Sequence, residues 1–160
     1  MKEKKGEHPL GDAGQLIFLA LFLIVWAVDS FFMHKSTFLS GYVPLYIRLA
    51  ILGIAILLGF CLARSGHVVI QHESRPTKVV GTGAFRYVRH PLYLASILFY
   101  FGLAVSTASL LSLGLLAVMF IFYNYIASYE EKLMDKKFGE DYIRYMKRTG
   151  KWVPKIGRGS

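Results

Sequence analysis

Three long apolar runs dominate the chain, and they predict helices that cross a membrane. The first covers residues 13–33 and is interrupted only by Asp29, and the second, residues 45–63, carries Arg48 near its start. The third contains no Asp, Glu, Lys or Arg in the thirty-nine positions from Pro91 to Tyr129. A single helix of that length would be roughly 58 Å long, about twice the hydrocarbon core of a bilayer. We therefore expect this run to fold back as a hairpin, which gives about four spanning helices.

The turn of this hairpin is predicted at residues 106–109, where small hydroxyl side chains interrupt the apolar run. Folding at that point returns His90 and Glu130, which bound the run, to the same face of the membrane. Polar chemistry is therefore expected at that end of the hairpin. We expect Asp29 at the opposite face, paired with Arg48 or His34 rather than engaged in catalysis.

The composition indicates an all-α, polytopic membrane protein. Of the 160 residues, 54% are hydrophobic and 15% aromatic, which is too apolar for a soluble basic domain. The net charge is +9, and seventeen of the nineteen Lys and Arg residues flank the apolar runs on one side of the predicted membrane. This distribution follows the positive-inside rule and predicts that both termini face the cytoplasm. Topology and attraction to membrane lipids explain the charge, so we expect no nucleic-acid binding.

The chain is expected to form one membrane domain with a C-terminal amphipathic helix. Met134, Phe138, Tyr142 and Met146 recur at helical spacing after the last apolar run, and Gly139 is expected to break this helix in two. The predicted parts are a flexible leader at 1–12, two spans within 13–63, a cytoplasmic loop at 64–91, the transmembrane hairpin at 92–127 and the amphipathic segment at 128–160.

Neither a disulfide nor a metal site is expected. Cys61 is the only cysteine, and it lies inside an apolar run where a thiol is usually a packing residue. His67 and His72 are five positions apart, and no second pair of His or Cys residues stands at a spacing that would complete a zinc site.

The ends of the hairpin are the place where the residues themselves point to chemistry. Pro91 suits the first turn of a helix, whose unpaired N–H groups favour an anionic group, while Glu130 or Glu131 favours a cationic one. A ligand with an amino-acid moiety would satisfy both. The alternative is that Arg89 and His90 reach lipid phosphates and the glutamates pair with Lys132; the residues alone leave both interpretations open.

The sequence resembles the isoprenylcysteine carboxyl methyltransferase family, whose core phospholipid N-methyltransferases share. The resemblance lies in KVVGTGAFRYVRHPLY at residues 78–93, followed at hairpin distance by Glu130-Glu131, Phe138-Gly139, Tyr142 and Tyr145. It covers roughly residues 71–148. It implies S-adenosyl-L-methionine as methyl donor, bound in a cytoplasm-facing pocket without a Rossmann fold, and a lipophilic acceptor that enters from the bilayer.

The same resemblance implies roles for individual residues. Glu130 would hold the amino group of the donor's methionine moiety, and Phe85 stands where a tyrosine is common, so ring packing is kept and a hydroxyl lost. Ile126 occupies a position where carboxyl-methylating members carry an arginine. The other residues expected around the donor are Gln71 (if a one-residue gap is allowed), Thr77, Lys78, Val79, Val80, Gly83, His90, Pro91, Leu92 and Tyr93.

Arg89 and Glu131 are the residues expected to take part in the reaction itself, Glu131 as a base if the acceptor is an amine. A carboxylate or thiolate acceptor needs mainly positioning and desolvation. Methylation of a carboxylate is favoured over that of a phospholipid amine or a thiol, and no obligate protein partner is expected. Two other classes remain open: an NADPH-dependent membrane reductase of the sterol reductase kind, which shares an RHPxY-like element, and a non-enzymatic membrane scaffold.

Overall fold

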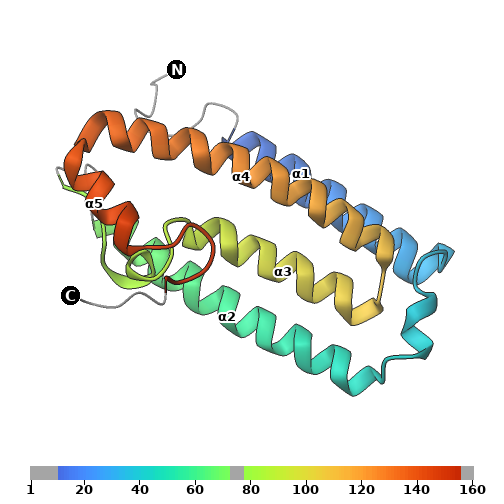
Figure 1. Ribbon diagram of the computed structural model, residues 1–160. Helices are drawn as coiled ribbons and strands as arrows, with labels where there is room; N and C mark the ends of the chain where they lie inside the picture. The colour runs from blue at the N-terminus through green and yellow to red at the C-terminus, as the bar shows by residue number, and fades with distance from the viewer. Residues whose placement is uncertain (1–10, 73–77, 156–160) are drawn as a thin grey trace.

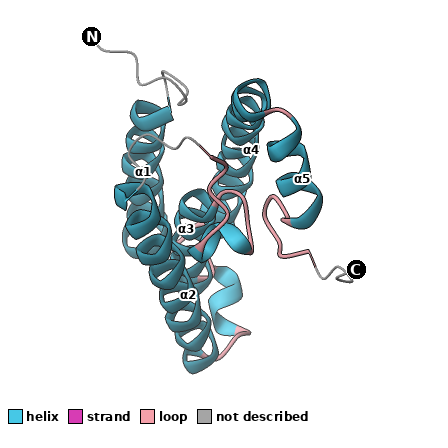
Figure 2. Cartoon of the chain, turned by 90° about the vertical axis from the view of Figure 1, so that its left-hand side faces the viewer, coloured by secondary structure: helices cyan, strands magenta, loops and turns pink. Residues whose placement is uncertain are grey.

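The computed structural model describes residues 11–72 and 78–155, and within them the chain forms helices and loops without a strand (Figure 2). The all-α fold class is thereby confirmed. The α-helices are α1 (Gly11–Ala27), α2 (Leu45–His72), α3 (Pro91–Thr107), α4 (Leu110–Phe138) and α5 (Glu140–Arg148). Three shorter elements join them, a π-helical turn η1 (Val28–Met33) and the 3-10 turns η2 (Phe38–Gly41) and η3 (Gly83–Arg86).

The four long helices run back and forth, with α1 beside α4 and α2 beside α3 (Figure 1). The segments Ala13–Met33, Leu45–Val68 and Leu110–Phe138 are long and apolar enough to cross a bilayer. Helix α3 is shorter, and its 17 residues extend about 26 Å, close to the thickness of the hydrocarbon core. The chain is therefore an integral membrane protein.

The predicted hairpin is present, because α3 ends at Thr107 and α4 begins at Leu110. Ser109 is the N-cap of α4, and its side chain accepts a hydrogen bond from the Ser112 N–H. The first charged residue of α4 is Glu130, so the membrane-spanning part of this helix is its apolar portion, residues 110–129. The helix continues past that portion and carries its charged end clear of the apolar layer.

Two boundaries differ from those predicted. Helix α2 continues to His72 instead of ending at Ala63, because no proline interrupts it before Pro76 and Gly66 fits closely against α3. A Cβ at Gly66 would lie 3.1 Å from a methyl carbon of Leu92. The amphipathic segment begins as the last turns of α4 rather than as a separate helix. The predicted break at Gly139 is confirmed, since its φ of +53° ends α4 before α5 begins.

Helices α2 and α3 approach each other closely where small residues face across the interface. A Cβ on Gly102 would lie 3.1 Å from the Cβ of Ala55, and one on Gly59 would lie 3.2 Å from the Ala95 carbonyl oxygen. Helices in a bilayer associate mainly through such van der Waals contact, because lipid is as apolar as their side chains. The close packing of α2 against α3 therefore holds α3 in place, and with it the loop that leads into Pro91.

The apolar core lies between α1, α3 and α4. Phe22 from α1, Tyr100 from α3 and Met119 and Tyr123 from α4 are almost completely buried there. The rings of Phe22 and Tyr100 lie 4.7 Å apart. This core holds α3 and α4 side by side, and so determines how close the polar start of α3 lies to the charged end of α4.

The end of the bundle farthest from α5 is held by a buried carboxylate, Asp29 in η1. It is 2% exposed and accepts hydrogen bonds from the Ser109 hydroxyl at 2.6 Å, from the Ser36 N–H at 3.1 Å and from the Ser36 hydroxyl. Because Ser109 caps α4, the charge of Asp29 lies at the positive end of that helix. Asp29 thus links the loop between α1 and α2, through Ser36, to the turn between α3 and α4, through Ser109.

The predicted pairing of Asp29 with Arg48 or His34 is wrong. Arg48 instead donates to the carbonyl oxygens of Ser106 at 2.6 Å and Val43 at 3.1 Å. His34 contacts Asp29 through its backbone N–H, which donates to the Asp29 carbonyl at 2.8 Å. The start of α4 and two hydroxyls satisfy the Asp29 carboxylate, while the Arg48 guanidinium binds one carbonyl at the end of α3 and one in the loop before α2.

We expect Asp29→Ala to lower the free energy of unfolding by about 2–4 kcal/mol, because the buried Ser109 hydroxyl and the half-buried Ser36 hydroxyl lose a charged acceptor. Thermal unfolding in detergent measures the change. Asp29→Asn should cost less, since the amide oxygen still accepts. Asp141→Ala, at an exposed position of α5, should have almost no effect. An unchanged midpoint for Asp29→Ala would show that this network does not stabilise the bundle.

Candidate functional site

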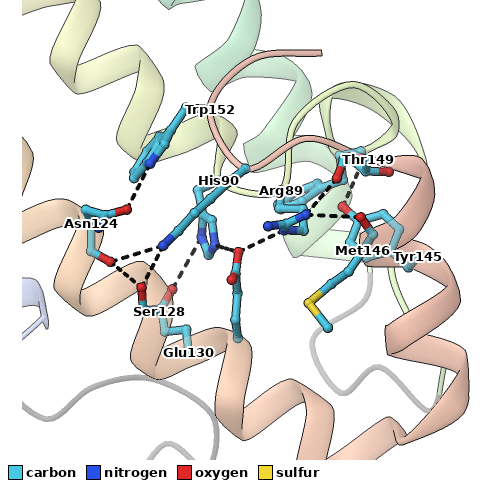
Figure 3. A network of polar contacts seen from close by, with 12 residues as sticks. Arg89, His90, Asn124, Ser128, Glu130, Tyr145, Met146, Thr149 and Trp152 are labelled. Carbon is cyan, nitrogen blue, oxygen red and sulfur yellow. Dashed lines mark hydrogen bonds and ion pairs between the residues drawn. The ribbon is translucent and has the colours of Figure 1, made fainter. Parts of the chain in front are cut away.

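The hairpin brings together five polar side chains at the start of α3 and the end of α4, which we call the His90 cluster: Arg89, His90, Tyr93, Glu130 and Glu131. Figure 3 shows His90 between Arg89 and Glu130. The His90 Nδ1 lies 3.7 Å from Glu130 Oε2, which confirms that the two ends of the apolar run meet at one face of the bundle.

Glu131 is the centre of this cluster. Its Oε1 accepts a hydrogen bond from Arg89 Nε at 2.8 Å and lies 3.1 Å from His90 Nε2. Arg89, His90 and Glu131 thus contact one another, which contradicts the alternative in which Arg89 and His90 reach lipid phosphates and Glu131 pairs with Lys132. Burial by itself would raise the pKa of Glu131, but the hydrogen bonds from His90 and Arg89 and the charge of Arg89 lower it to about 2. A carboxylate that binds a proton so weakly is a poor base, which argues against the base role predicted for it.

Arg89 connects the cluster to the C-terminal part of the chain. Its guanidinium donates to the carbonyl oxygens of Thr149 at 2.6 Å and Met146 at 3.3 Å, and its backbone N–H donates to the Gly150 carbonyl at 2.9 Å. The side chain is 11% exposed. With its donors directed at Glu131 and these carbonyls, Arg89 holds α5 and the segment after it against the start of α3 (Figures 1 and 3).

His90 is held by rings on two sides. Its imidazole stacks on Tyr93 with centroids 5.7 Å apart, and the Trp152 ring lies at 5.8 Å. Burial lowers the pKa of His90; Glu131 opposes this shift, and the charges of Lys151 and Arg89 add to it. The lowered pKa favours the neutral ring. Because Nε2 faces the ionised Glu131, we assign the ring hydrogen to Nε2 and the lone pair to Nδ1.

Glu130 and the start of α3 present opposite charges to the same space. The Tyr93 hydroxyl donates to Glu130 Oε1 at 2.6 Å, which orients the carboxylate. Pro91 occupies the first turn of α3, and the N-cap residue His90 makes no side-chain capping bond. The positive helix end is thus left for an anion while Glu130 offers a site for a cation. This donor set fits the zwitterionic amino-acid moiety expected from the sequence.

The remaining predicted residues precede the cluster in the chain. Thr77 lies outside the described residues; Gln71 belongs to α2, but its side chain is not among those described. Lys78 is exposed, and Val79 and Val80 are half-buried. These residues are followed by Gly81, where a Cβ would lie 3.5 Å from the Tyr145 ring of α5.

The loop residues Gly83 and Phe85 have structural contacts of their own. Gly83 begins η3 with a φ of +57°, a conformation that favours glycine. The Phe85 carbonyl accepts a hydrogen bond from the Tyr145 hydroxyl at 2.6 Å, and the Ser65 hydroxyl of α2 accepts one from the Ala84 N–H at 2.9 Å. The loop is thereby fixed between α2 and α5.

Four residues that the sequence did not single out lie next to the cluster. Lys151 Nζ donates to the Ser128 hydroxyl at 2.7 Å and to the Asn124 carbonyl at 3.2 Å, and Trp152 Nε1 donates to Asn124 Oδ1 at 3.1 Å. One signal was available in α4, where Asn124, Ser128 and Glu131 follow each other at i, i+4 and i+7 and so form one polar stripe. Lys151 and Trp152 had no comparable signal.

Comparison with known proteins gives a family match over the part of the chain that holds the cluster. Residues 48–141 match the phospholipid methyltransferase family. Methanethiol S-methyltransferase of Crocosphaera subtropica is 26% identical over 161 residues, which cover 96% of this chain and 55% of that protein. Methanethiol S-methyltransferase 1 of Bradyrhizobium diazoefficiens is 32% identical over 92 residues, or 55% of this chain and 32% of that protein. The chain thus spans about half the length of the first and a third of the second.

We expect the protein to lose stability as the pH falls from about 4.5 to 2, and Glu131→Gln to weaken that loss. The pKa of Glu131 is lower in the folded protein than its ordinary value of 4.5, so its stabilisation is present above that value and disappears as it becomes protonated. The shift corresponds to about 3 kcal/mol.

Thermal unfolding in detergent between about pH 6 and pH 3 measures this dependence. Glu140→Gln, at an exposed position of α5, is the matched control and should leave the pH dependence unchanged. A Glu131→Gln protein with the wild-type slope would contradict the assignment of the low pKa to the buried ion pair.

Proposed function

This chain belongs to the phospholipid methyltransferase family, and on that premise we propose that it uses S-adenosyl-L-methionine to methylate a small lipophilic thiol at the membrane surface. The observation that carries the proposal is that the matching region includes the α3–α4 hairpin and every residue of the His90 cluster. The family match favours methyl transfer over the NADPH-dependent reductase and the scaffold.

Glu130 and Tyr93 of the His90 cluster, together with the start of α3, would bind the amino-acid moiety of the donor. Glu130, oriented by Tyr93, would hold its ammonium group, and the open first turn of α3 would hold its carboxylate. Residues 77–80 would line the adenosine, as the family resemblance implies. When bound, S-adenosyl-L-methionine supplies a methyl group on a sulfonium sulfur, which is electrophilic enough to react without a metal.

The chain's own contribution is to orient the reactants and exclude water. The side chains of His90 and Glu131 are 9% and 15% exposed, and the buried rings of Tyr100 and Tyr123 lie below them in the core. An acceptor brought into such a place loses its hydration before it meets the methyl group. Positioning and desolvation together account for most of the rate in a transfer to a thiolate.

Two observations support sulfur as the acceptor atom. Both similar proteins are named as methanethiol S-methyltransferases. In addition, Ile126 is 1% exposed, so the position where carboxyl-methylating proteins carry an arginine is here part of the apolar packing and offers no cation to a carboxylate. A thiol is therefore proposed ahead of the carboxylate favoured from the sequence. The positive-inside pattern supports a site that faces the cytoplasm.

We expect purified protein in detergent to bind S-adenosylhomocysteine with measurable heat, and Glu130→Gln to weaken this binding at least tenfold, since the ligand's ammonium group loses its carboxylate partner. Calorimetry with S-adenosylhomocysteine and, separately, with NADPH provides the measurement. Glu140→Gln changes the same charge at an exposed position of α5 and should bind as the wild type does.

A radiolabelled methyl donor then identifies the acceptor class. We expect label to be transferred to small alkyl thiols in preference to prenylcysteine carboxylates and phospholipid amines. Binding of NADPH alone, or of neither ligand, would contradict the methyltransferase assignment. Transfer to a carboxylate or an amine with intact S-adenosylhomocysteine binding would retain the assignment and overturn only the sulfur acceptor.

A further inference from the structure

Resting on the proposed function, we propose that His90 is the base that takes the proton from the acceptor thiol, and that Glu131 is a positioning residue that orients the imidazole for this role. At neutral pH an unperturbed alkyl thiol is almost fully protonated, and the thiolate is the nucleophile. A site that methylates such a thiol therefore gains from a base placed beside the methyl donor.

The geometry leaves one ring nitrogen for this task. His90 Nε2 lies 3.1 Å from Glu131 Oε1, and that same oxygen accepts the Arg89 Nε–H at 2.8 Å. Nε2 is thus committed to a carboxylate that is itself held in place. The ring cannot turn freely, because Tyr93 stacks on it and Trp152 lies nearby. Nδ1 consequently faces the space beside Glu130, at 3.7 Å from Oε2.

Charged groups from each neighbouring element surround the ring. Glu130 and Glu131 come from α4, Arg89 from the loop before α3, Lys151 from the segment after α5, and the Tyr93 hydroxyl from α3. Burial has the largest effect on the pKa of His90 and lowers it; Glu131 raises it, and Lys151 and Arg89 add to the lowering, which favours the neutral ring. A neutral imidazole with hydrogen on Nε2 carries the lone pair on Nδ1, which is the state that a base requires.

The proton and the electrons balance in this step. The thiol proton moves to His90 Nδ1, and the pair left on the acceptor sulfur forms the new bond to the methyl carbon. The pair of the broken bond stays with the donor sulfur, which becomes a neutral thioether. The imidazolium keeps its Nε2–H directed at Glu131, whose ionised carboxylate stabilises it until Nδ1 releases the proton to water. Carboxylates orient and stabilise a histidine base in the same manner in hydrolytic triads.

The test compares two thiols of similar size and different acidity, phenylmethanethiol and thiophenol. Phenylmethanethiol is almost fully protonated at neutral pH, whereas thiophenol is largely ionised and needs no base. We expect His90→Gln to lower kcat for phenylmethanethiol by about 10²- to 10⁴-fold and to change kcat for thiophenol by less than about threefold. Glu131→Gln should show the same selectivity with a smaller loss. His67→Gln, at an exposed position of α2, is the control.

A measurement on the protein without donor gives an independent readout. Nitrogen-15 NMR of labelled histidine, assigned by the signal missing in His90→Gln, should show His90 neutral at pH 7 with hydrogen on Nε2. In Glu131→Gln this preference should weaken, because an amide oxygen attracts the N–H less than a carboxylate does. Hydrogen on Nδ1, or a doubly protonated ring at neutral pH, overturns the proposal whatever the turnover measurements show.

The outcomes separate this inference from the proposed function. Equal losses for both thiols, with S-adenosylhomocysteine still bound by His90→Gln, would leave the methyltransferase intact and reduce His90 to a wall of the site. Failure of the wild-type protein to bind S-adenosylhomocysteine would instead remove the proposed function itself. The expected result is a loss confined to the protonated thiol together with near wild-type binding.

Discussion

The ion pair between Arg89 and Glu131 links three parts of the chain that are far apart in sequence. Glu131 brings in α4, Arg89 the loop that leads into α3, and the carbonyls bound by Arg89 belong to Met146 and Thr149 at the end of α5. Buried charges are costly unless they are paired and hydrogen-bonded, so Arg89 and Glu131 stabilise the cluster by binding each other. The orientation of His90 depends on this pair.

The two ends of the bundle deal with buried charge in different ways. At the end with the hairpin turn, Asp29 is enclosed by hydroxyls, an N–H group and the start of α4, and this closed network stabilises the fold. At the other end, neighbouring glutamates have different surroundings. Glu131 is committed to Arg89 and His90, whereas Glu130 is oriented by Tyr93 toward the space beside the start of α3. A closed network suits stability, and an oriented carboxylate beside an open helix end suits a ligand.

Much of this architecture follows from the sequence alone. A charge-free run too long for one span required a hairpin, because backbone groups in lipid must bond within a helix, and the hairpin required His90 and Glu130 to be neighbours. The motif at residues 78–93 together with Glu130-Glu131 indicated the family that the comparison later matched. The length and hydropathy of an apolar run can be read from consecutive residues, so the sequence alone predicts where the helices cross the membrane and where the chain turns back.

Only the tertiary structure decided which polar groups pair. Asp29 accepts hydrogen bonds from serines at the start of α4 and in the first loop instead of pairing with Arg48. Glu131 is held by Arg89 and His90, and Lys151 and Trp152 of the C-terminal segment bind Asn124. Hydrogen-bond partners depend on separations of about 3 Å and on burial, both of which are set by packing between distant segments. No periodicity in the chain encodes them.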